Sequence, residues 1–204
     1  WLAIDSVRGK TKIIHPNLTS AEFTNTNYID SFDSNGFTMN TNGDINGSSY
    51  TFVAFAWKAG GAAVSNTDGS ITSSVSAGNG FSIVSYSGSG SAGTVGHGLS
   101  TTPGLVICKD RSASDTWLVW AKGFSSNEYL YLNTDAGKSS YSGTWGSTPT
   151  NSVFGVSDQA ANQSGNNFLA YCFADVPGRQ RISTYIGNGS STGPVVVTGF
   201  KPRF

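Results

Sequence analysis

The chain has 204 residues and a mass of 21.3 kDa, and its 12 basic side chains are balanced by 12 acidic ones. This balance provides no basic field to attract nucleic acid or an anionic membrane, and no apolar run approaches the roughly 20 residues of a membrane-spanning helix. We therefore expect neither a nucleic acid partner nor a membrane span.

The composition favours pleated sheet and tight turns, because glycine is abundant at 26 residues and the chain carries 12 Phe, 8 Tyr and 5 Trp. In chain order, short apolar runs between Gly, Asn and Ser turns predict strands that end at Met39, cover 52–57, 81–86, 104–109, 117–120 and 128–132, end at Val156, and cover 168–173, 182–186 and 195–200. This spacing predicts an all-β protein, an antiparallel, jelly-roll-like β-sandwich.

An internal repeat, unit B, contains two of these strands. FVAFAW (52–57) matches FLAYCF (168–173) at an offset of 169 − 53 = 116, and the same offset places Trp1 on Trp117. Each copy also has an earlier strand signal, SNGFTM in the first and TNSVFGV in the second, followed by an Asn- and Gly-rich turn.

A second repeat, unit A, follows each unit B. VSYSGSGSAGTVGHGLSTTP (84–103) resembles STYIGNGSSTGPVVVTGFKP (183–202) at an offset of 99. The order B, A, B, A predicts a fold built from an internally repeated unit. Residues 1–80 form the first unit B with a linker, and residues 81–204 form the first unit A, the second unit B and the second unit A. We expect all four to pack as one or two β-sandwich domains.

Both faces of the repeated strand are apolar. In the second copy one face carries Leu169, Tyr171 and Phe173, and the other carries mostly small residues; the first copy divides in the same way around Val53 and Phe55. A strand that is apolar on both faces is covered on each side. We therefore predict that 52–57 and 168–173 are both central strands.

The two cysteines lie in apolar, strand-like runs, Cys108 in LVICKD and Cys172 in LAYCFAD. Two interpretations are open. Buried reduced thiols would act as small apolar side chains, and a disulfide would join two neighbouring strands. The sequence does not give the Cβ separation on which a bridge depends.

No motif for catalysis or cofactor binding is found. His15 lies in a turn before Pro16, His97 has no counterpart in the second unit A, and the only glutamates are Glu22 and Glu128. CxxC and HExxH patterns are missing, and the oxygen-rich turns NGDING and NTDGS lack the spacing and the distal Glu of a calcium loop. We predict no enzymatic activity, no cofactor and no metal site.

Carbohydrate contact is suggested by aromatic residues in and around the polar run YLYLNTDAGKSSYSGTW (129–145). Sugars contact aromatic faces and short polar side chains, and the candidates are Trp120, Tyr129, Tyr131, Tyr141 and Trp145. Packing of the same rings in the core is the competing interpretation. Four N-x-S/T sequons are also present, at Asn17, Asn46, Asn162 and Asn188, and they matter only where a glycosylation machinery meets the protein.

Several phrases resemble a family of phage virion proteins: SFDSNGFTM with YTFVAFAWKAGG, NTDGSITSSVSA, GFSIVSYSGSGSAGTVGHGL and YIGNGSSTGPVVVTGF. The family is an uncharacterised repeat domain of tail-fibre-like structural proteins of cyanophages and marine phages, and the likeness covers about residues 31–204. It implies a virion or appendage component and transfers no catalytic residues. Because family members continue past the position of GFKPRF, the likeness also implies that this chain is an excerpt of a longer protein.

The sequence therefore predicts a structural protein of an extracellular assembly, a phage tail fibre or virion appendage that contacts host-surface glycans. The alternative is a carbohydrate-binding or adhesive module outside phages, or a subunit of an extracellular filament. Expected partners are copies of the chain, other virion proteins and surface glycans, and the expected location is the virion or the extracellular space. Because the first unit B and the last unit A have no neighbouring unit to pair with, we expect terminal strands to complement adjacent subunits in a head-to-tail fibre.

Overall fold

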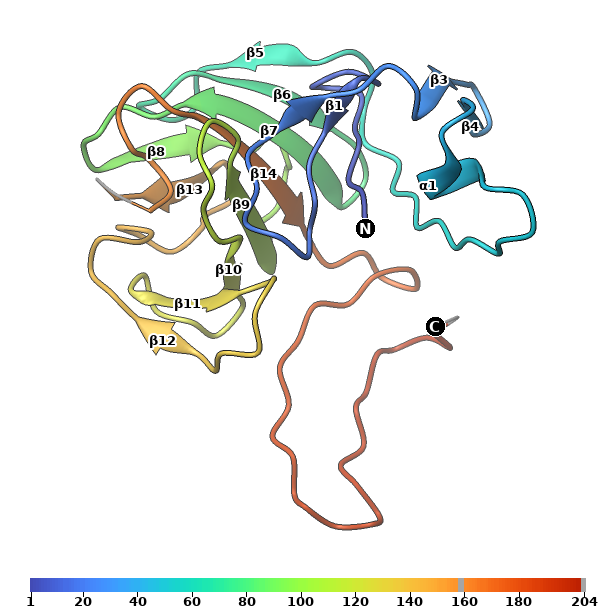
Figure 1. Cartoon of the computed structure of the whole chain (residues 1–204). Helices are drawn as coiled ribbons and strands as arrows, with labels where there is room; N and C mark the ends of the chain where they lie inside the picture. Colours follow the sequence, from blue (N-terminus) through green and yellow to red (C-terminus); the bar gives the residue numbers. More distant parts are fainter. Residues whose placement is uncertain (158–159, 203–204) are drawn as a thin grey trace.

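The structure is a computed structural model that describes residues 1–157 and 160–202, and it is built around one large antiparallel sheet (Figure 1). The sheet has eight strands in the order β12-β11-β10-β9-β14-β7-β6-β5. Their bounds are β5 (Val64–Asn66), β6 (Ser73–Ala77), β7 (Phe81–Ser87), β9 (Leu105–Asp110), β10 (Leu118–Ala121), β11 (Glu128–Tyr131), β12 (Ser139–Ser140) and β14 (Asn167–Phe173).

Three two-stranded sheets complete the fold. They are β1 (Lys12–Ile13) with β2 (Phe23–Thr24), β3 (Ile29–Phe32) with β4 (Phe37–Met39), and β8 (Gly93–Gly96) with β13 (Val153–Val156). The helix α1 (Gly43–Asn46) is a single turn, capped by the Asn42 side chain, which accepts a hydrogen bond from the backbone N–H of Asp44 at 2.8 Å. The prediction of an all-β antiparallel sandwich is confirmed.

Strand β14 lies at the centre of the large sheet, between β7 and β9. Phe168, Ala170 and Cys172 point into the main core, which the β8–β13 pair closes on that side. The opposite face carries Leu169 and Tyr171, which pack in a second core cluster. The predicted central strand with two apolar faces is thus confirmed for the second copy of unit B.

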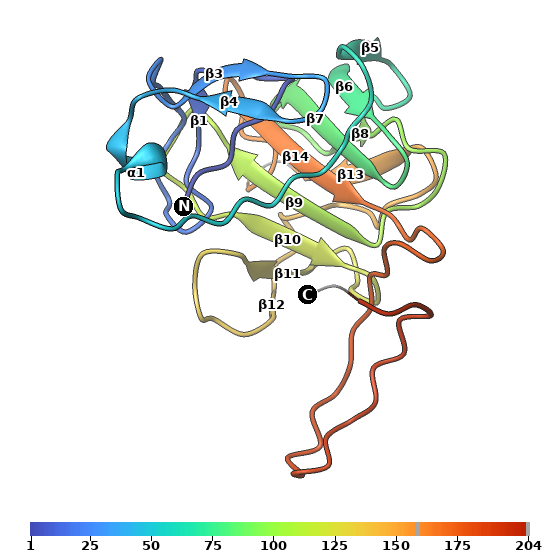
Figure 2. The ribbon, with the colours of Figure 1, turned by 90° about the vertical axis from the view of Figure 1, so that its right-hand side faces the viewer.

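The second face of the sheet is covered by the N-terminal segment, residues 1–24. Ile14 packs there against Ile83, Trp117 and Leu169. The Trp117 indole N–H also donates a hydrogen bond to the backbone carbonyl of His15 at 3.0 Å. Figure 2, turned by 90°, shows β1 of this segment beside the large sheet.

The first unit A and the second unit B fold as one body. β7 pairs with β14 over seven residue pairs, from Asn167↔Ser87 to Phe173↔Phe81, and β8 pairs with β13 over four. Both strands of the first unit A, β7 and β8, therefore pair with strands of the second unit B. The pairing joins a unit A to a unit B and does not join two copies of the same unit.

In the first unit B the strand that ends at Met39 is confirmed as β4, but the other predicted strands of the first unit B and the second unit A are wrong. Residues 51–60, which include FVAFAW, belong to no helix or strand, and neither do residues 182–198, where strands 182–186 and 195–200 were expected. The physical reason is the lack of a partner, because a strand satisfies its backbone groups only in a ladder, and both edges of β14 are already taken by β7 and β9.

The two copies of the repeated strand allow a matched test of this fold. Leu169 is fully buried, whereas its repeat equivalent Val53 is 78% exposed. Leu169→Ala should lower the free energy of unfolding by about 2–5 kcal/mol, because it leaves a cavity in the core. Val53→Ala should change it by no more than about 0.5 kcal/mol. Urea unfolding of the dilute monomer measures both values, and similar losses for the two variants would contradict the structure.

Candidate interaction surface

Two segments expose apolar side chains to solvent. We call residues 50–57 the aromatic segment and residues 182–200 the C-terminal arm. Five large apolar side chains of the aromatic segment are between 47% and 78% exposed, and five of the arm are between 48% and 89% exposed. They are Tyr50, Phe52, Val53, Phe55 and Trp57 in the aromatic segment, and Tyr185, Ile186, Val195, Val196 and Val197 in the arm. Apolar exposure of this extent marks a surface that binds another molecule.

The aromatic segment is fixed to the body at its C-terminal end. The Trp57 ring lies edge-on to Phe173, with centroids 5.8 Å apart, and 6.3 Å from the ring of Phe81. Just beyond it, a Cβ on Gly60 would lie 2.3 Å from the backbone oxygen of Ala77, so only glycine allows this close approach. The end at Trp57 is therefore held, while Phe52 and Val53 stand in solvent.

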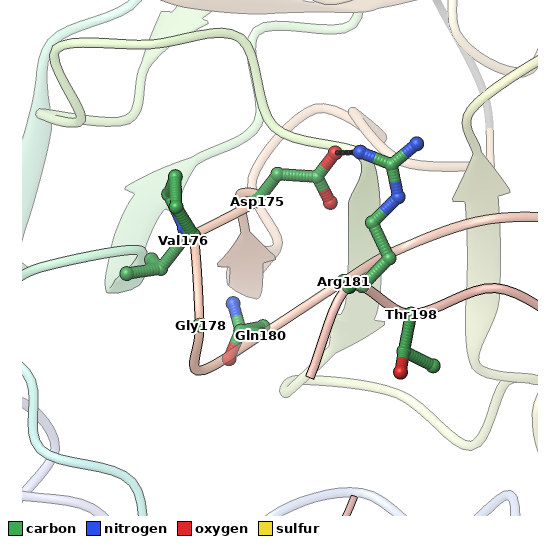
Figure 3. Close-up of a pocket in the computed structure, with 8 residues that line it drawn as sticks. Asp175, Val176, Gly178, Gln180, Arg181 and Thr198 are labelled. Carbon is green, nitrogen blue, oxygen red and sulfur yellow. Dashed lines mark hydrogen bonds and ion pairs between the residues drawn. The ribbon is translucent and has the colours of Figure 1, made fainter. Parts of the chain in front are cut away.

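The C-terminal arm is fixed at its root and free beyond it. Asp175 accepts a hydrogen bond from the Arg181 guanidinium at 3.1 Å (Figure 3). It also accepts one from the backbone N–H of Ile182 at 2.6 Å. The Gln180 amide donates to the backbone carbonyls of Gly80 and Ala174 at 2.9 and 2.7 Å. Figures 1 and 2 both show the chain after this root leaving the body as an open loop.

A hollow of about 220 Å³ lies where the arm returns to its root. Val176, Gln180, Arg181 and Thr198 line it (Figure 3). The Arg181 guanidinium is already paired with Asp175, so the charge in the hollow is balanced. The hollow is thus a consequence of how the arm is anchored.

The predicted carbohydrate contacts fall in different places. Trp120 and Trp145 are buried in the main core, so neither ring presents a face to solvent, and their assignment as surface contacts is corrected. Tyr129 and Tyr131 lie side by side on β11, with ring centroids 5.1 Å apart, and are partly buried against the same core. Tyr141 alone of the five is well exposed, at 53%. The structure therefore does not assemble the five rings into one platform.

The two cysteines are free thiols in the core. Cys108 lies on β9 and Cys172 on the adjacent β14, but the register pairs Cys108 with Ala170. The interpretation as a disulfide is therefore corrected in favour of buried thiols. Burial raises the pKa of Cys108 to about 12, and burial also raises the pKa of Cys172.

We expect both thiols to be unreactive in the folded chain, because burial excludes the reagent and disfavours the nucleophilic thiolate. Iodoacetamide at neutral pH should label neither Cys108 nor Cys172 until urea is added, and both afterwards. Mass spectrometry of the labelled chain measures this. An unfolded chain that takes up label only after reduction would show that a disulfide is present.

The four sequons differ in accessibility. Asn17, Asn46 and Asn188 are exposed, and Asn162 is fully buried. The Asn162 side chain accepts a hydrogen bond from the backbone N–H of Ser89 at 2.8 Å and donates to the backbone carbonyl of Ser91 at 2.6 Å. Asn162 therefore clamps the first unit A loop onto the second unit B, and no glycan can sit there in the folded chain.

His97 is a fully buried structural residue. Its Nδ1 accepts a hydrogen bond from the backbone N–H of Leu99 at 3.1 Å, so Nε2 carries the proton that it donates to the carbonyl of Thr150 at 3.2 Å. Burial lowers the pKa of His97 below its ordinary value of 6.5. His15 stacks on Phe23 with ring centroids 5.3 Å apart.

Glu22 belongs to a buried ion network that holds the N-terminal segment on the sheet. It pairs with Arg111 at 2.9 Å and with Arg8 at 3.1 Å, and Arg8 also pairs with Asp5 at 2.6 Å. Asp5 accepts a further hydrogen bond from the Tyr171 hydroxyl of β14 at 2.8 Å. Burial alone would raise the pKa of Glu22, but hydrogen bonds and charge from Arg111 and Arg8 outweigh it and lower the pKa.

Removal of Glu22 should be costly. Glu22→Ala leaves the buried Arg8 charge without one of its partners and should lower the free energy of unfolding by about 3–5 kcal/mol at neutral pH. Glu128→Ala is the matched control, because the ion pair of Glu128 with Lys138 is exposed to solvent and its loss should cost far less stability.

The pH dependence of the Glu22→Ala deficit follows from the sign of the pKa shift. Because the folded chain lowers the pKa of Glu22, its stabilisation is complete above the ordinary value of 4.5 and is lost as the pH falls through the folded pKa. The deficit of Glu22→Ala should therefore shrink below about pH 4.5. Urea unfolding between pH 3 and pH 7 measures it, and a deficit that does not vary with pH would contradict the network.

Metal binding finds no support in residues 1–157 and 160–202, which bring together no group of three or more His, Cys, Asp or Glu side chains suited to a metal ion. In the same residues no helix is long and apolar enough to cross a membrane.

Sequence reasoning missed two buried features of the structure, the ion network around Glu22 and the role of Asn162. The ion network joins Glu22 to Arg111 across 89 positions, and no local pattern signals such a pair. The buried role of Asn162, by contrast, had a signal. The repeat continues from Phe52 back to Asn46, which aligns with Asn162, so these two sequons are part of unit B.

The fold and these segments define an antiparallel β-sandwich with two uncovered apolar segments. The chain belongs to the family described as a domain of unknown function, DUF7483, which matches residues 1–204. No curated protein and no solved structure gives a significant match.

Proposed function

We propose that the protein is a structural component of an extracellular assembly, a phage tail fibre or another virion appendage. The observation that carries this proposal is the exposure of the aromatic segment and the C-terminal arm, which together leave ten large apolar side chains in solvent. Burying such segments against other subunits removes them from water, at about 25 cal/mol per Å² of apolar surface. The resemblance of SFDSNGFTM and YIGNGSSTGPVVVTGF to tail-fibre-like proteins supports the virion setting.

A role in assembly also agrees with how the chain uses its reactive groups. His97 is buried and hydrogen-bonded, Glu22 is held between two arginines, and Glu128 is paired with Lys138. Each of these three side chains thus has a structural contact. The proposed partners are copies of the chain and other virion proteins, and the proposed location is the virion or the extracellular space.

Glycan contact is a second candidate function, in a virion protein or in an adhesive module or filament outside phages. It is favoured by exposed Tyr141 and by a hollow of about 340 Å³ over β5 to β7. The hollow is lined largely by residues whose hydroxyl groups match sugar hydroxyls, among them Ser65, Thr72, Ser74, Ser85 and Ser87. A glycan array that shows no binding at millimolar sugar would remove this candidate.

The virion proposal predicts that the chain is a stoichiometric part of purified phage particles. Mass spectrometry of gradient-purified virions should detect peptides of residues 1–204 in a fixed ratio to the capsid protein. Antibody-gold labelling in the electron microscope should then place the chain on an appendage. Particles that lack the chain while the infected cell lysate contains it would contradict the proposal.

A further inference from the structure

We infer that two copies of the chain join head to tail, by antiparallel pairing of the C-terminal arm of one copy with the aromatic segment of the other. The register is the one that β7 and β14 use within the chain. This inference rests on the proposed function, because it specifies the joint between copies of a structural protein. The model for this joint is the pairing of the first unit A with the second unit B, in which β7 pairs with β14 and β8 with β13. Within the described residues, the aromatic segment of the first unit B and the arm of the second unit A form no such pair.

The offsets of the two repeats predict which residues of the arm lie opposite which residues of the aromatic segment in the joint between copies. Within the chain, Ser85 lies opposite Leu169. The offset of 99 carries Ser85 to Thr184, and the offset of 116 carries Leu169 to Val53. The same operation places residues 183–185 of one copy opposite residues 52–54 of the next. Ile182 is held at the root of the arm, so the new ladder begins at Ser183.

The likeness between the two unit B copies extends to the backbone. INGSSYTF (45–52) aligns with ANQSGNNF (161–168), which places Ser49 on Gly165. Gly165 has a φ of 82°, and Ser49, at 71°, is the non-glycine residue with a positive φ among the described residues. Serine adopts this region at a cost. The uncovered unit B therefore holds the same turn as the covered one, before any partner is present.

The asparagine clamp has an exposed counterpart in the first unit B. Asn162 binds the loop of the first unit A through Ser89 and Ser91. Its equivalent Asn46 is exposed and donates a hydrogen bond to the backbone carbonyl of Asn40 at 2.9 Å, and the equivalent loop lies around Ser190 in the arm. The inference assigns to Asn46 the clamping of this loop of the neighbouring copy.

The glycines of the arm leave room for a close contact that is not made within the single chain. A Cβ on Gly88 would lie 2.2 Å from the backbone oxygen of Gln163, so the covered joint requires glycine at this position. The equivalent residue, Gly187, has nothing within 4 Å of its Cβ position, and Gly189 is equally open. The arm therefore carries the small residues of a tight joint while nothing yet contacts them.

A second contact follows from the β8–β13 pair. GTVGHGL (93–99) aligns with PVVVTGF (194–200) once two residues are inserted, and Gly98 and Gly199 both have a positive φ, of 67° and 82°. Within the chain, Val95 lies opposite Phe154. The earlier strand of unit B, SNGFTM, aligns with NSVFGV at an offset of 154 − 37 = 117, one residue more than the offset of FVAFAW. The equivalent pair is therefore Val196 of the arm and Phe37 of β4, and both side chains are exposed.

The partner is a second copy because one chain leaves the two segments apart. Figures 1 and 2 both show the arm leading away from the body and not along residues 50–57. Each copy offers one arm and one aromatic segment, so the joint is heterologous and repeats from copy to copy. Strand addition of this kind gains affinity from backbone hydrogen bonds and specificity from the alternate side chains.

Cysteine crosslinking tests the register. The backbone N–H of Ala174 donates to Gly80 and that of Gly88 donates to Asn166, so the even-numbered residues of β7 form the hydrogen-bonded pairs of this ladder. Ser85 and Leu169 are then a non-hydrogen-bonded pair, whose Cα atoms lie about 4.5 Å apart, within the range of a disulfide. The equivalent variants are Val53→Cys and Thr184→Cys.

The two variants are made in separate full-length chains of different mass, mixed and mildly oxidised. We expect a disulfide-linked heterodimer on a non-reducing gel, and mass spectrometry should identify the link between positions 53 and 184. The control mixes Val53→Cys with Ser183→Cys, whose side chain points to the other face of the strand, and should give at most about a tenth of that product. Equal yields from both mixtures would contradict the proposed register. In a double variant, Val53→Cys with Thr184→Cys, a disulfide that forms within one chain would contradict the claim that the partner is a second copy.

Gly187→Val tests the joint without disturbing the free chain. The free chain accommodates the valine, whereas the joint does not, so light scattering should show loss of the concentration-dependent assembly with an unchanged melting temperature of the monomer. Gly137→Val is the matched control, because Gly137 is also open and lies in the loop between β11 and β12. It should assemble like the unsubstituted chain.

The outcomes separate this inference from the proposed function. If the Gly187→Val chain still assembles and no 53–184 link forms, the inference is overturned, while a virion role through another joint stands. If the unsubstituted chain stays monomeric at all concentrations and no link forms, the inference is overturned as well, and the virion experiment decides the proposed function alone.

Discussion

The ladder between β7 and β14 is the interaction on which the rest of the structure depends. It joins the first unit A to the second unit B over seven residue pairs and provides a platform with two apolar faces. One face receives the β8–β13 pair, and the other receives the N-terminal segment, which the ion network of Asp5, Arg8, Glu22 and Arg111 holds in place. Because β9 takes the remaining edge of β14, the large sheet is complete without a strand from residues 50–57 or 182–200.

The aromatic segment and the C-terminal arm have no strand partner because both edges of β14 are already paired. A β-strand is stable only with a partner, and exposed strand-forming segments are a hazard unless they are meant to pair. The C-terminal arm keeps the glycines of a covered joint, and the residues just before the aromatic segment keep its turn at Ser49 and its clamp residue Asn46. An intermolecular joint copied from the internal one accounts for these features together, and for the large apolar side chains that both segments expose.

The sequence predicted the parts of the fold that local pattern determines. Alternation of apolar residues identified β14 with both of its faces, its neighbours β7 and β9, and β10 beyond β9. The repeats were visible from FVAFAW and FLAYCF. The same pattern misassigned FVAFAW, because whether a strand forms depends on a partner elsewhere in the chain. It could not separate buried Trp120 and Trp145 from exposed Tyr141, since the burial of an aromatic ring is decided by packing between distant strands. The sequence pattern could not predict the ion pair of Glu22 with Arg111 either, because these residues are brought together by packing between distant segments.

Hydrogen exchange of the unsubstituted chain, followed over a range of concentrations, tests the central claim most directly. The account predicts that amides in residues 52–54 and 183–187 become protected together as the concentration rises, with the same midpoint, while the amides of β7 and β14 stay protected throughout. Protection of only one of the two segments, or of neither while the chain assembles, would contradict a joint built from the arm of one copy and the aromatic segment of another.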